Sequence, residues 1–355
     1  MKRILALILV LSMAFALSAC GSSSSSTSAP AATQAPAAAP AENPAPTEEP
    51  EPEIHYPTQA IRVIVPYGAG GNTDLNARII AEIATQNNML PNGQAMIVTN
   101  VTGANTANAI EAVLDADPDG YTVLMHQTAM LAQYNLGNIE TTYTDFTCVA
   151  QVFESPLIVS ARMDAPFDTL EECVAYAKEH PGEVTWAHTG VGQSSFLATE
   201  ALLSNYHGED IHEYFKILAY TGGADSSAAQ LGGDIMIRVG SALDTMQYVE
   251  SGDIKLLCVS GSERLPLAPD TPCYKDLGCE ENFALHQGYF VRKDTPQEVV
   301  DILSDIIFQA ISTDEYKEFC KNAGGFARNK TGAEFAATLE AVNSVVKEIC
   351  DNAQK

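Results

Sequence analysis

Basic residues are scarce in this sequence of 355 residues. It contains 19 lysines and arginines against 45 aspartates and glutamates, which gives a formal net charge of -26. A field of that sign repels nucleic acid and anionic lipid headgroups, so neither is an expected partner. An acidic protein that binds a small anion needs local hydrogen-bond donors, which helix N-termini provide.

Several motifs of enzymes and cofactor-binding proteins are absent as well. No G-x-x-x-x-G-K-[ST] or G-x-G-x-x-G segment is present to hold a nucleotide, and no G-x-S-x-G elbow is present to activate a serine. The histidines lack H-E-x-x-H spacing, so we expect no metal and no cofactor. No acid, base and nucleophile set is recognisable, and we therefore expect a protein that is not an enzyme.

The N-terminus has the pattern of a secretion signal. Met1–Arg3 is basic, and the apolar run Ile4–Leu17 is shorter than the ~20 residues that a membrane crossing needs. The signal, residues 1–19, ends before Cys20 in Leu-Ser-Ala-Cys, which resembles the lipobox of bacterial lipoproteins. That resemblance implies lipidation of Cys20 and an exported protein anchored to the outer face of the cytoplasmic membrane. A plain cleavable signal is the alternative.

Residues 20–55 consist almost wholly of Ser, Thr, Ala, Pro, Gln and Glu without apolar periodicity. Such a segment cannot bury enough surface to order itself, so we predict a lipid-anchored disordered linker. The remaining chain, Tyr56–Lys355, is long enough for two domains of common size.

Strand-like and helix-like runs alternate through this remainder, which indicates α/β architecture. The predicted strands are 61–65, 95–100, 122–125, 157–160, 183–187, 216–219, 235–239, 256–260 and 284–292. The predicted helices are 74–86, 105–116, 170–180, 195–206, 223–231, 242–251, 296–312, 314–322 and 332–353. The last three helices follow one another without a predicted strand, as a C-terminal cap on the first domain.

Two glycine-rich stretches share one local pattern of strand, glycine loop and helix start. We name Pro66–Asp74 the first glycine loop and Thr189–Ser195 the second glycine loop. In this pattern free backbone N–H groups gather at a helix N-terminus, where the dipole favours an anion. His188 ends the strand before the second loop, either as a ligand donor or as a packed or solvent-facing residue. The pair predicts two facing walls of an anion site.

Seven cysteines remain beyond Cys20. Cys273 and Cys279 bracket a loop and are the best candidate disulfide, although sequence cannot assign connectivity.

Several separate motifs, in the right order, together resemble the tripartite tricarboxylate transporter receptors, the Bug or TctC family. They are Tyr56–Pro57, 61–74, 100–103, 118–122, 190–195, 220–223, 232–233 and 264–272. The resemblance covers nearly all of Tyr56–Lys355. It implies a type II periplasmic-binding-protein (Venus flytrap) fold of two lobes that close over a small carboxylate, with two interlobe crossings. Lobe 1 would comprise 56–160 and 259–355, and lobe 2 would comprise 161–258.

The resemblance also implies the ligand contacts. One carboxylate would be held between the loops by Tyr67, Gly70, Gly71, Thr73 and Asp74 and by Thr189, Gly190, Gly192, Ser194 and Ser195. The far end of the ligand would meet Gln127, Thr128, Tyr220, Thr221, Gly240 and Ser241.

Two residues leave the ligand's charge open. Asp74 either caps its helix or turns inward, where it would favour an ammonium group and hence an amino acid. This sequence departs from the family pattern at Gly240-Ser241, and Arg238 lies in the strand before them. Arg238 either points into the cleft and grips a second carboxylate or is a surface or ion-paired residue.

The resemblance implies a monomeric receptor that captures a small carboxylate, with di- or tricarboxylates foremost, and delivers it to membrane permease subunits. The alternatives are a ligand sensor of the same fold for a signalling partner, and a binder of amino acids or other small acids.

Overall fold

The computed structural model describes residues 55–220, 222–279 and 283–353. The predicted signal, Cys20 and linker lie outside the described residues, as does Thr221. Within the described ranges, every helix is too short or too polar to cross a bilayer.

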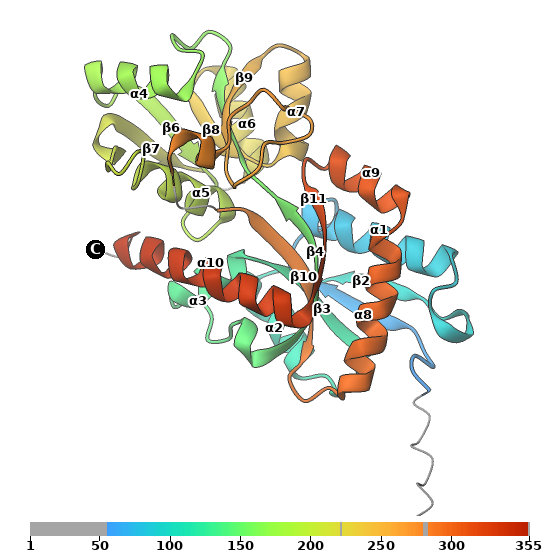
Figure 1. Cartoon of the computed structure of the whole chain (residues 1–355). Coiled ribbons are helices and arrows are strands. Elements are labelled where there is room, and N and C mark those ends of the chain that lie inside the picture. Colours follow the sequence, from blue (N-terminus) through green and yellow to red (C-terminus); the bar gives the residue numbers. More distant parts are fainter. Residues whose placement is uncertain (1–54, 221, 280–282, 354–355) are drawn as a thin grey trace, which may run out of the picture. The chain divides into compact units, whose positions relative to one another are not determined.

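Six strands form the first sheet in the order β11-β4-β10-β3-β1-β2 (Figure 1). β1 is parallel to β2 and β3, whereas β10 is antiparallel to β3 and β4, and β11 is antiparallel to β4. The bounds are β1 Ile61–Val65, β2 Met96–Asn100, β3 Thr122–Gln127, β4 Phe146–Ser155, β10 Leu285–Arg292 and β11 Phe326–Thr331.

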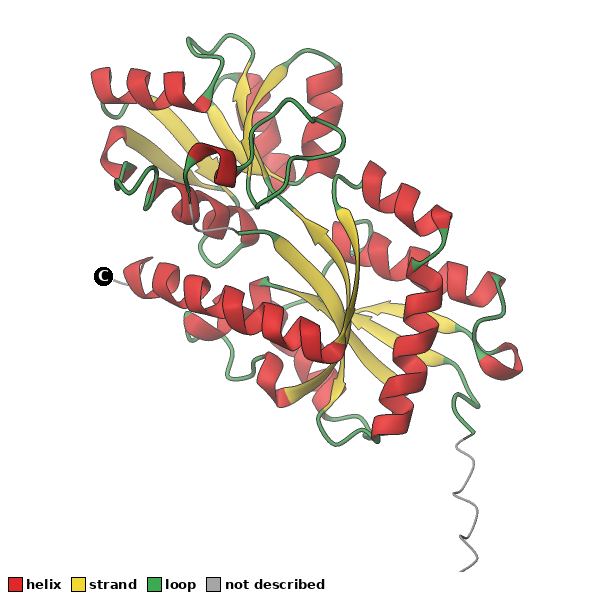
Figure 2. Ribbon diagram, viewed as in Figure 1, coloured by secondary structure: helices red, strands yellow, loops and turns green. Residues whose placement is uncertain are grey.

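Helices cover both faces of this sheet (Figure 2). On one face lie α1 (Asn72–Gln86), α8 (Gln297–Ile311) and α9 (Asp314–Asn322); on the other lie α2 (Ala107–Leu114), α3 (Ala129–Asn135) and α10 (Gly332–Ala353). Because both faces are covered, the central strands are almost continuously apolar, as in Ile61–Val65, where only Arg62 is exposed.

Five strands form the second sheet in the order β7-β6-β8-β5-β9. They are β5 Ile158–Arg162, β6 Val184–His188, β7 Phe215–Ala219, β8 Ile237–Gly240 and β9 Ile254–Val259. The helices are α4 Leu170–Glu179, α5 Ser194–Leu203, α6 Gly223–Gly232 and α7 Ala242–Glu250. α4 and α5 belong to the large core, whereas α6 and α7 pack in small clusters on the other face.

Short 3-10 helices occur in the connections; they are η1 Pro91–Gly93, η2 Ala104–Thr106, η3 Tyr143–Asp145, η4 His212–Tyr214 and η5 Tyr274–Leu277. The chain passes from the first sheet to the second between Ser155 and Ile158 and returns between Val259 and Leu285. The lobe limits predicted above remain a prediction. Strand pairing assigns β5 as a whole to the second sheet.

Three elements were missed by the sequence prediction. β4 is buried through most of its ten residues, so it lacks the alternation that marks a strand. α3 has only seven residues, too few to show helical periodicity. The prediction that no strand separates the last three helices is wrong, because β11 lies between α9 and α10. β11 is a polar edge strand that forms by pairing with β4.

The candidate disulfide is corrected as well. Cys273 and Cys279 are both thiols among the described residues. The sulfur of Cys279 donates a hydrogen bond to the carbonyl oxygen of Ala201 at 3.2 Å, and Cys273 lies beside β9. Their side chains therefore pack against different elements.

Candidate ligand-binding site

A cavity of about 380 Å³ lies where α5, α6 and α7 begin. At none of these three helix starts does the N-cap side chain accept a hydrogen bond from the first amides. Those amides have no intrahelical acceptor, so three positive helix ends converge on one space. The lining residues are Leu157, Thr189, Gln193, Ser194, Ser195, Gly222, Gly223, Val239, Gly240, Ser241, Asp244 and Leu285.

The second glycine loop is held in shape by its own side chains. The hydroxyl oxygen of Ser195 accepts from the backbone N–H of Thr189 at 2.8 Å and lies 2.6 Å from the Thr189 hydroxyl. Nδ1 of His188 accepts from the N–H of Gly190 at 3.0 Å. Burial lowers the pKa of His188 although Glu200 and Gly190 act against it, so the imidazole is a neutral support of the loop.

The floor of the cavity rests on a buried arginine. Arg238 in β8 is 0% exposed, and its guanidinium contacts Ser226 Oγ at 3.0 Å, Thr245 Oγ1 at 3.1 Å and Asp244 Oδ2 at 2.8 Å. A Cβ built on Gly240 would lie 2.6 Å from three guanidinium atoms. Arg238 is therefore ion-paired beneath the cavity and does not line it.

The first glycine loop is also braced by an ion pair. Asp74 is buried, and it accepts from the N–H of Gly70 at 2.8 Å, from Arg78 Nε at 2.9 Å and from Asn100 Nδ2 at 2.7 Å. Burial alone would raise the pKa of Asp74, but these hydrogen bonds lower it. Asp74 thus holds its own loop with a neutralised charge.

Polar side chains connect the first loop to the cavity. Gln287 accepts from Asn76 at 2.7 Å and donates to Asn72 at 3.2 Å, both in the first turns of α1. Two residues earlier on β10, Leu285 lines the cavity. His286 lies between them on β10, and its N–H donates to the hydroxyl of Thr128 at 2.9 Å.

Tyr67 packs edge-on against His126, with ring centroids 5.8 Å apart. Burial lowers the pKa of His126 to about 4 and raises the pKa of Tyr67. The Tyr67 hydroxyl lies near Gln127, but neither it nor Gln127 Oε1 makes a hydrogen bond in the structure. Both atoms are buried on the first-sheet side and do not line the cavity at the starts of α5, α6 and α7.

The predicted site residues fall into three groups. Those that line the cavity are Thr189, Ser194, Ser195, Gly240 and Ser241. Those that support it from behind or beside it are His188, Gly190, Gly192, Tyr220 and Arg238. Those on the first-sheet side, which do not line it, are Tyr67, Gly70, Gly71, Thr73, Asp74, Gln127 and Thr128. Thr221 is outside the described residues.

Sequence reasoning missed Gln193, Gly222, Gly223 and Asp244. Gln193 lies inside the second loop, and Gly222-Gly223 was noticed only as part of the resemblance. Asp244 carried a signal that could have been used, because it lies in the first turn of the helix after Gly240-Ser241. α3 was missed too, yet Gln133 donates to the carbonyl oxygen of Gly192 at 3.2 Å and ties the first-sheet helices to the second loop.

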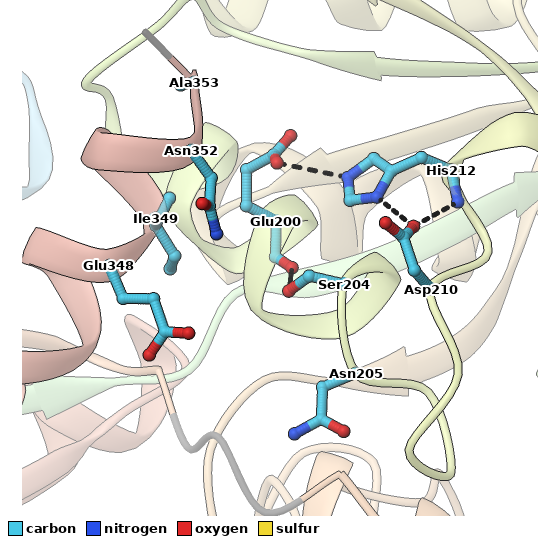
Figure 3. Close-up of a pocket in the computed structure, with 9 residues that line it drawn as sticks. All are labelled: Glu200, Ser204, Asn205, Asp210, His212, Glu348, Ile349, Asn352 and Ala353. Atoms are coloured by element: carbon cyan, nitrogen blue, oxygen red, sulfur yellow. Dashed lines mark hydrogen bonds and ion pairs between the residues drawn. The ribbon is translucent and has the colours of Figure 1, made fainter. Parts of the chain in front are cut away.

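A second cavity, of about 520 Å³, lies at the opposite end of α5, against η4 and α10 (Figure 3). Three carboxylates line it, from Glu200, Asp210 and Glu348. His212 lies 3.1 Å from Glu200 and 2.7 Å from Asp210. Burial alone would lower the pKa of His212, but the carboxylates of Glu200 and Asp210 raise it. The acidic lining makes this cavity unsuitable for an anion.

Among the described residues no cluster of histidine, cysteine and acidic side chains could hold a metal ion.

The two-sheet α/β fold and its cavity of helix N-termini define a solute-binding protein of the periplasmic type. A sequence model of the tripartite tricarboxylate transporter family receptors matches residues 77–340. The chain belongs to this family, which consists of solute-binding receptors and not of enzymes.

Relatives and structures agree with this assignment. The UPF0065 protein in the gbd 5′ region of Cupriavidus necator is 30% identical over 277 residues, 74% of this chain and 78% of that protein. The crystal structure of a TctC solute-binding protein from Polaromonas is 28% identical with a TM-score of 0.71, covering 84% of this chain and 99% of that one. MatC of Rhodopseudomonas palustris, solved with bound malate, is 22% identical with a TM-score of 0.68, covering 83% and 100%.

Proposed function

We propose that this receptor captures a small carboxylate in the cavity where α5, α6 and α7 begin. The convergence of three uncapped helix N-termini carries the proposal, because backbone amides bind an anion without a cationic side chain. The volume of about 380 Å³ is near the lower end of the ~300–1,000 Å³ usual for ligand pockets, which suits a small acid. Di- and tricarboxylates are the first candidates, and malate in MatC is in keeping with them.

We further propose that the first glycine loop completes the site when the lobes close. In the structure this loop is preformed by Asp74, Arg78 and Asn100, and its helix start carries free donors of the same kind. Closure would let both loops contact one anion, so ligand would favour the closed form. An X-ray scattering profile that does not change with saturating ligand would contradict closure.

The closed receptor would deliver its ligand to membrane permease subunits, as the family description implies. Cys20 would hold it at the outer face of the cytoplasmic membrane by a lipid. A Cys20→Ser variant should then leave the membrane fraction and appear in the soluble extracytoplasmic fraction. Ser24→Ala, in the same segment, serves as the control and should stay with the membrane. Membrane retention of Cys20→Ser would contradict the lipid anchor.

A thermal-shift screen of the purified protein tests the ligand proposal. A ligand of the native state at ~100-fold above its Kd adds about 2.7 kcal/mol, which should raise the midpoint by about 5 °C. We expect a shift from one or more of succinate, malate, citrate and aspartate, and none from the matched neutral succinamide. No shift from any carboxylate, after unfolding and refolding to remove a retained ligand, would refute carboxylate capture.

A further inference from the structure

One carboxylate of the protein itself lies in the proposed anion cavity. Asp244, in the first turn of α7, lines the cavity and has a side chain that is 37% exposed. Its Oδ1 accepts from the hydroxyls of Ser241 at 3.1 Å and Thr245 at 3.2 Å. Its Oδ2 lies 2.8 Å from the guanidinium of Arg238. The carboxylate is thus fixed in place while part of it remains open to the cavity.

The position of Asp244 follows from the arginine behind it. Arg238 is fully buried; Ser226 Oγ accepts from its Nε, Thr245 Oγ1 accepts from its Nη1, and the Asp244 carboxylate lies at ion-pair distance from its Nη2. Removing Asp244 from this pair would leave a buried cation without its counter-ion, which is strongly unfavourable. Asp244 is therefore held by Arg238 and is not free to swing away from an incoming ligand.

The ion pair of Arg238 and Asp244 also determines which hydrogen-bonding groups the floor of the cavity presents. Arg238 neutralises the charge of Asp244 but does not reach the cavity, so the exposed carboxylate oxygens present only acceptors there. The helix starts of α5, α6 and α7 present donors. One cavity thus offers donors for a carboxylate and a separate acceptor.

We propose that Asp244 is a specificity-determining residue that selects carboxylates bearing a hydroxyl or ammonium group. This proposal rests on the proposed function, since it names the substrate class of the same cavity. A hydroxyl or ammonium donates to the open side of Asp244, whereas an acid without a donor leaves that acceptor unsatisfied. A hydrogen bond to a charged group of this kind corresponds to roughly tenfold to hundredfold in affinity.

Calorimetric titration with skeleton-matched acids tests the proposal. The sets are succinate, malate and aspartate; butyrate, 4-hydroxybutyrate and 4-aminobutyrate; and tricarballylate and citrate. Within the skeleton that fits the cavity, we expect the donor-bearing acid to bind at least about tenfold more tightly than the unsubstituted one. In D244N, which nearly keeps the size of the side chain but removes its charge, the preference for the ammonium member should collapse. D234N removes an exposed carboxylate outside the cavity and should keep the preference.

The outcomes distinguish the role of Asp244 from carboxylate capture, the proposed function on which it rests. If no acid in any set binds the wild-type protein, carboxylate capture itself fails, and the role of Asp244 fails with it. If acids bind but the unsubstituted members bind as tightly as their donor-bearing partners, capture stands and the role of Asp244 is refuted. The wild-type ranking decides this even if D244N does not fold. Where D244N folds, an undiminished preference for the ammonium member also refutes it.

Discussion

The two ends of α5 differ in the ligands that they can accept. At its start, Ser194 and Ser195 line a cavity shared with the starts of α6 and α7, where backbone amides are the donors. At its end, Glu200 and Ser204 line a cavity shared with Asp210 and Glu348. The second cavity has the larger volume, but its side chains repel an anion. Helix N-termini thus give an acidic protein a place where backbone amides, and not cationic side chains, face a cavity.

The largest expected effect comes from adding a side chain at Gly240, where the Arg238 guanidinium lies close to the backbone. In Gly240→Ala the new methyl group would lie 2.6 Å from the buried Arg238 guanidinium, which would have to leave Ser226, Thr245 and Asp244 to make room. Breaking this ion pair should lower the free energy of unfolding by about 3 kcal/mol and abolish ligand binding. Urea denaturation measures the first effect and calorimetry the second. Gly222→Ala is the control for stability, since nothing lies within 4 Å of its Cβ; equal stability of the two variants would contradict the packing argument.

Two serines on α5 compare its ends directly. Ser195→Ala leaves the part-buried N–H of Thr189 without its acceptor, which should cost about 1 kcal/mol and loosen the second glycine loop. Ser204→Ala removes only a hydroxyl that donates to the carbonyl oxygen of Glu200, and should cost less than about 0.5 kcal/mol. Ligand affinity should fall in Ser195→Ala alone. Equal losses of affinity would mean that the start of α5 has no special part in binding.

His188 supports the loop beside the first cavity and His212 lines the second, and their pKa values are shifted in opposite directions. Burial lowers the pKa of His188, so its stabilising contribution is present above about pH 6.5 and is lost as the pH falls through its folded value. Glu200 and Asp210 raise the pKa of His212 against the effect of burial, so its contribution is present below about pH 6.5 and is lost as the pH rises through its folded value. NMR titration of the two imidazoles checks the order, with His188→Gln and His212→Gln assigning the signals. A higher pKa for His188 than for His212 would overturn the comparison.

The smallest expected effect is that of Glu348→Gln in the acidic cavity. Removing one of three carboxylates reduces their repulsion and should raise stability by no more than about 0.5 kcal/mol. Affinity for the carboxylate ligand should not change, because the cavity at the start of α5 is untouched. Glu179→Gln, on α4 and exposed, controls for the loss of one charge. A change in ligand affinity larger than that of the control would show that the ligand uses both ends of α5.

Much of the fold was predictable because the local signals were strong. β1 was predicted with its observed bounds, and α4 begins at its predicted residue, where Thr169 and Glu172 form a capping box. β4 escaped because it is covered on both faces and continues, after Pro156, into the apolar β5. β11 escaped because its polar sequence becomes a strand only beside β4.

In the candidate site, too, some features could be predicted from local sequence and others depend on contacts between distant elements. The two glycine loops were predictable because a strand, glycines and a helix start are neighbours in sequence. Asp244 has a local signal in the first turn of α7, but its place at the cavity depends on Arg238, Gly240 and Gly223 meeting there. Arg238 itself was weighed as a residue of the cleft, but its burial is set by Ser226 on α6 and Thr245 on α7.

The α/β class, the family and the two glycine loops could be predicted from the sequence, because each depends on residues close together in the chain or on an ordered set of motifs. Contacts between distant elements were needed to show that three helix starts share one cavity, that Asp74 and Arg238 each form an ion pair, and that Asp244 lines that cavity. The physical reason is that pairing and burial of charges depend on contacts between elements that no local pattern records.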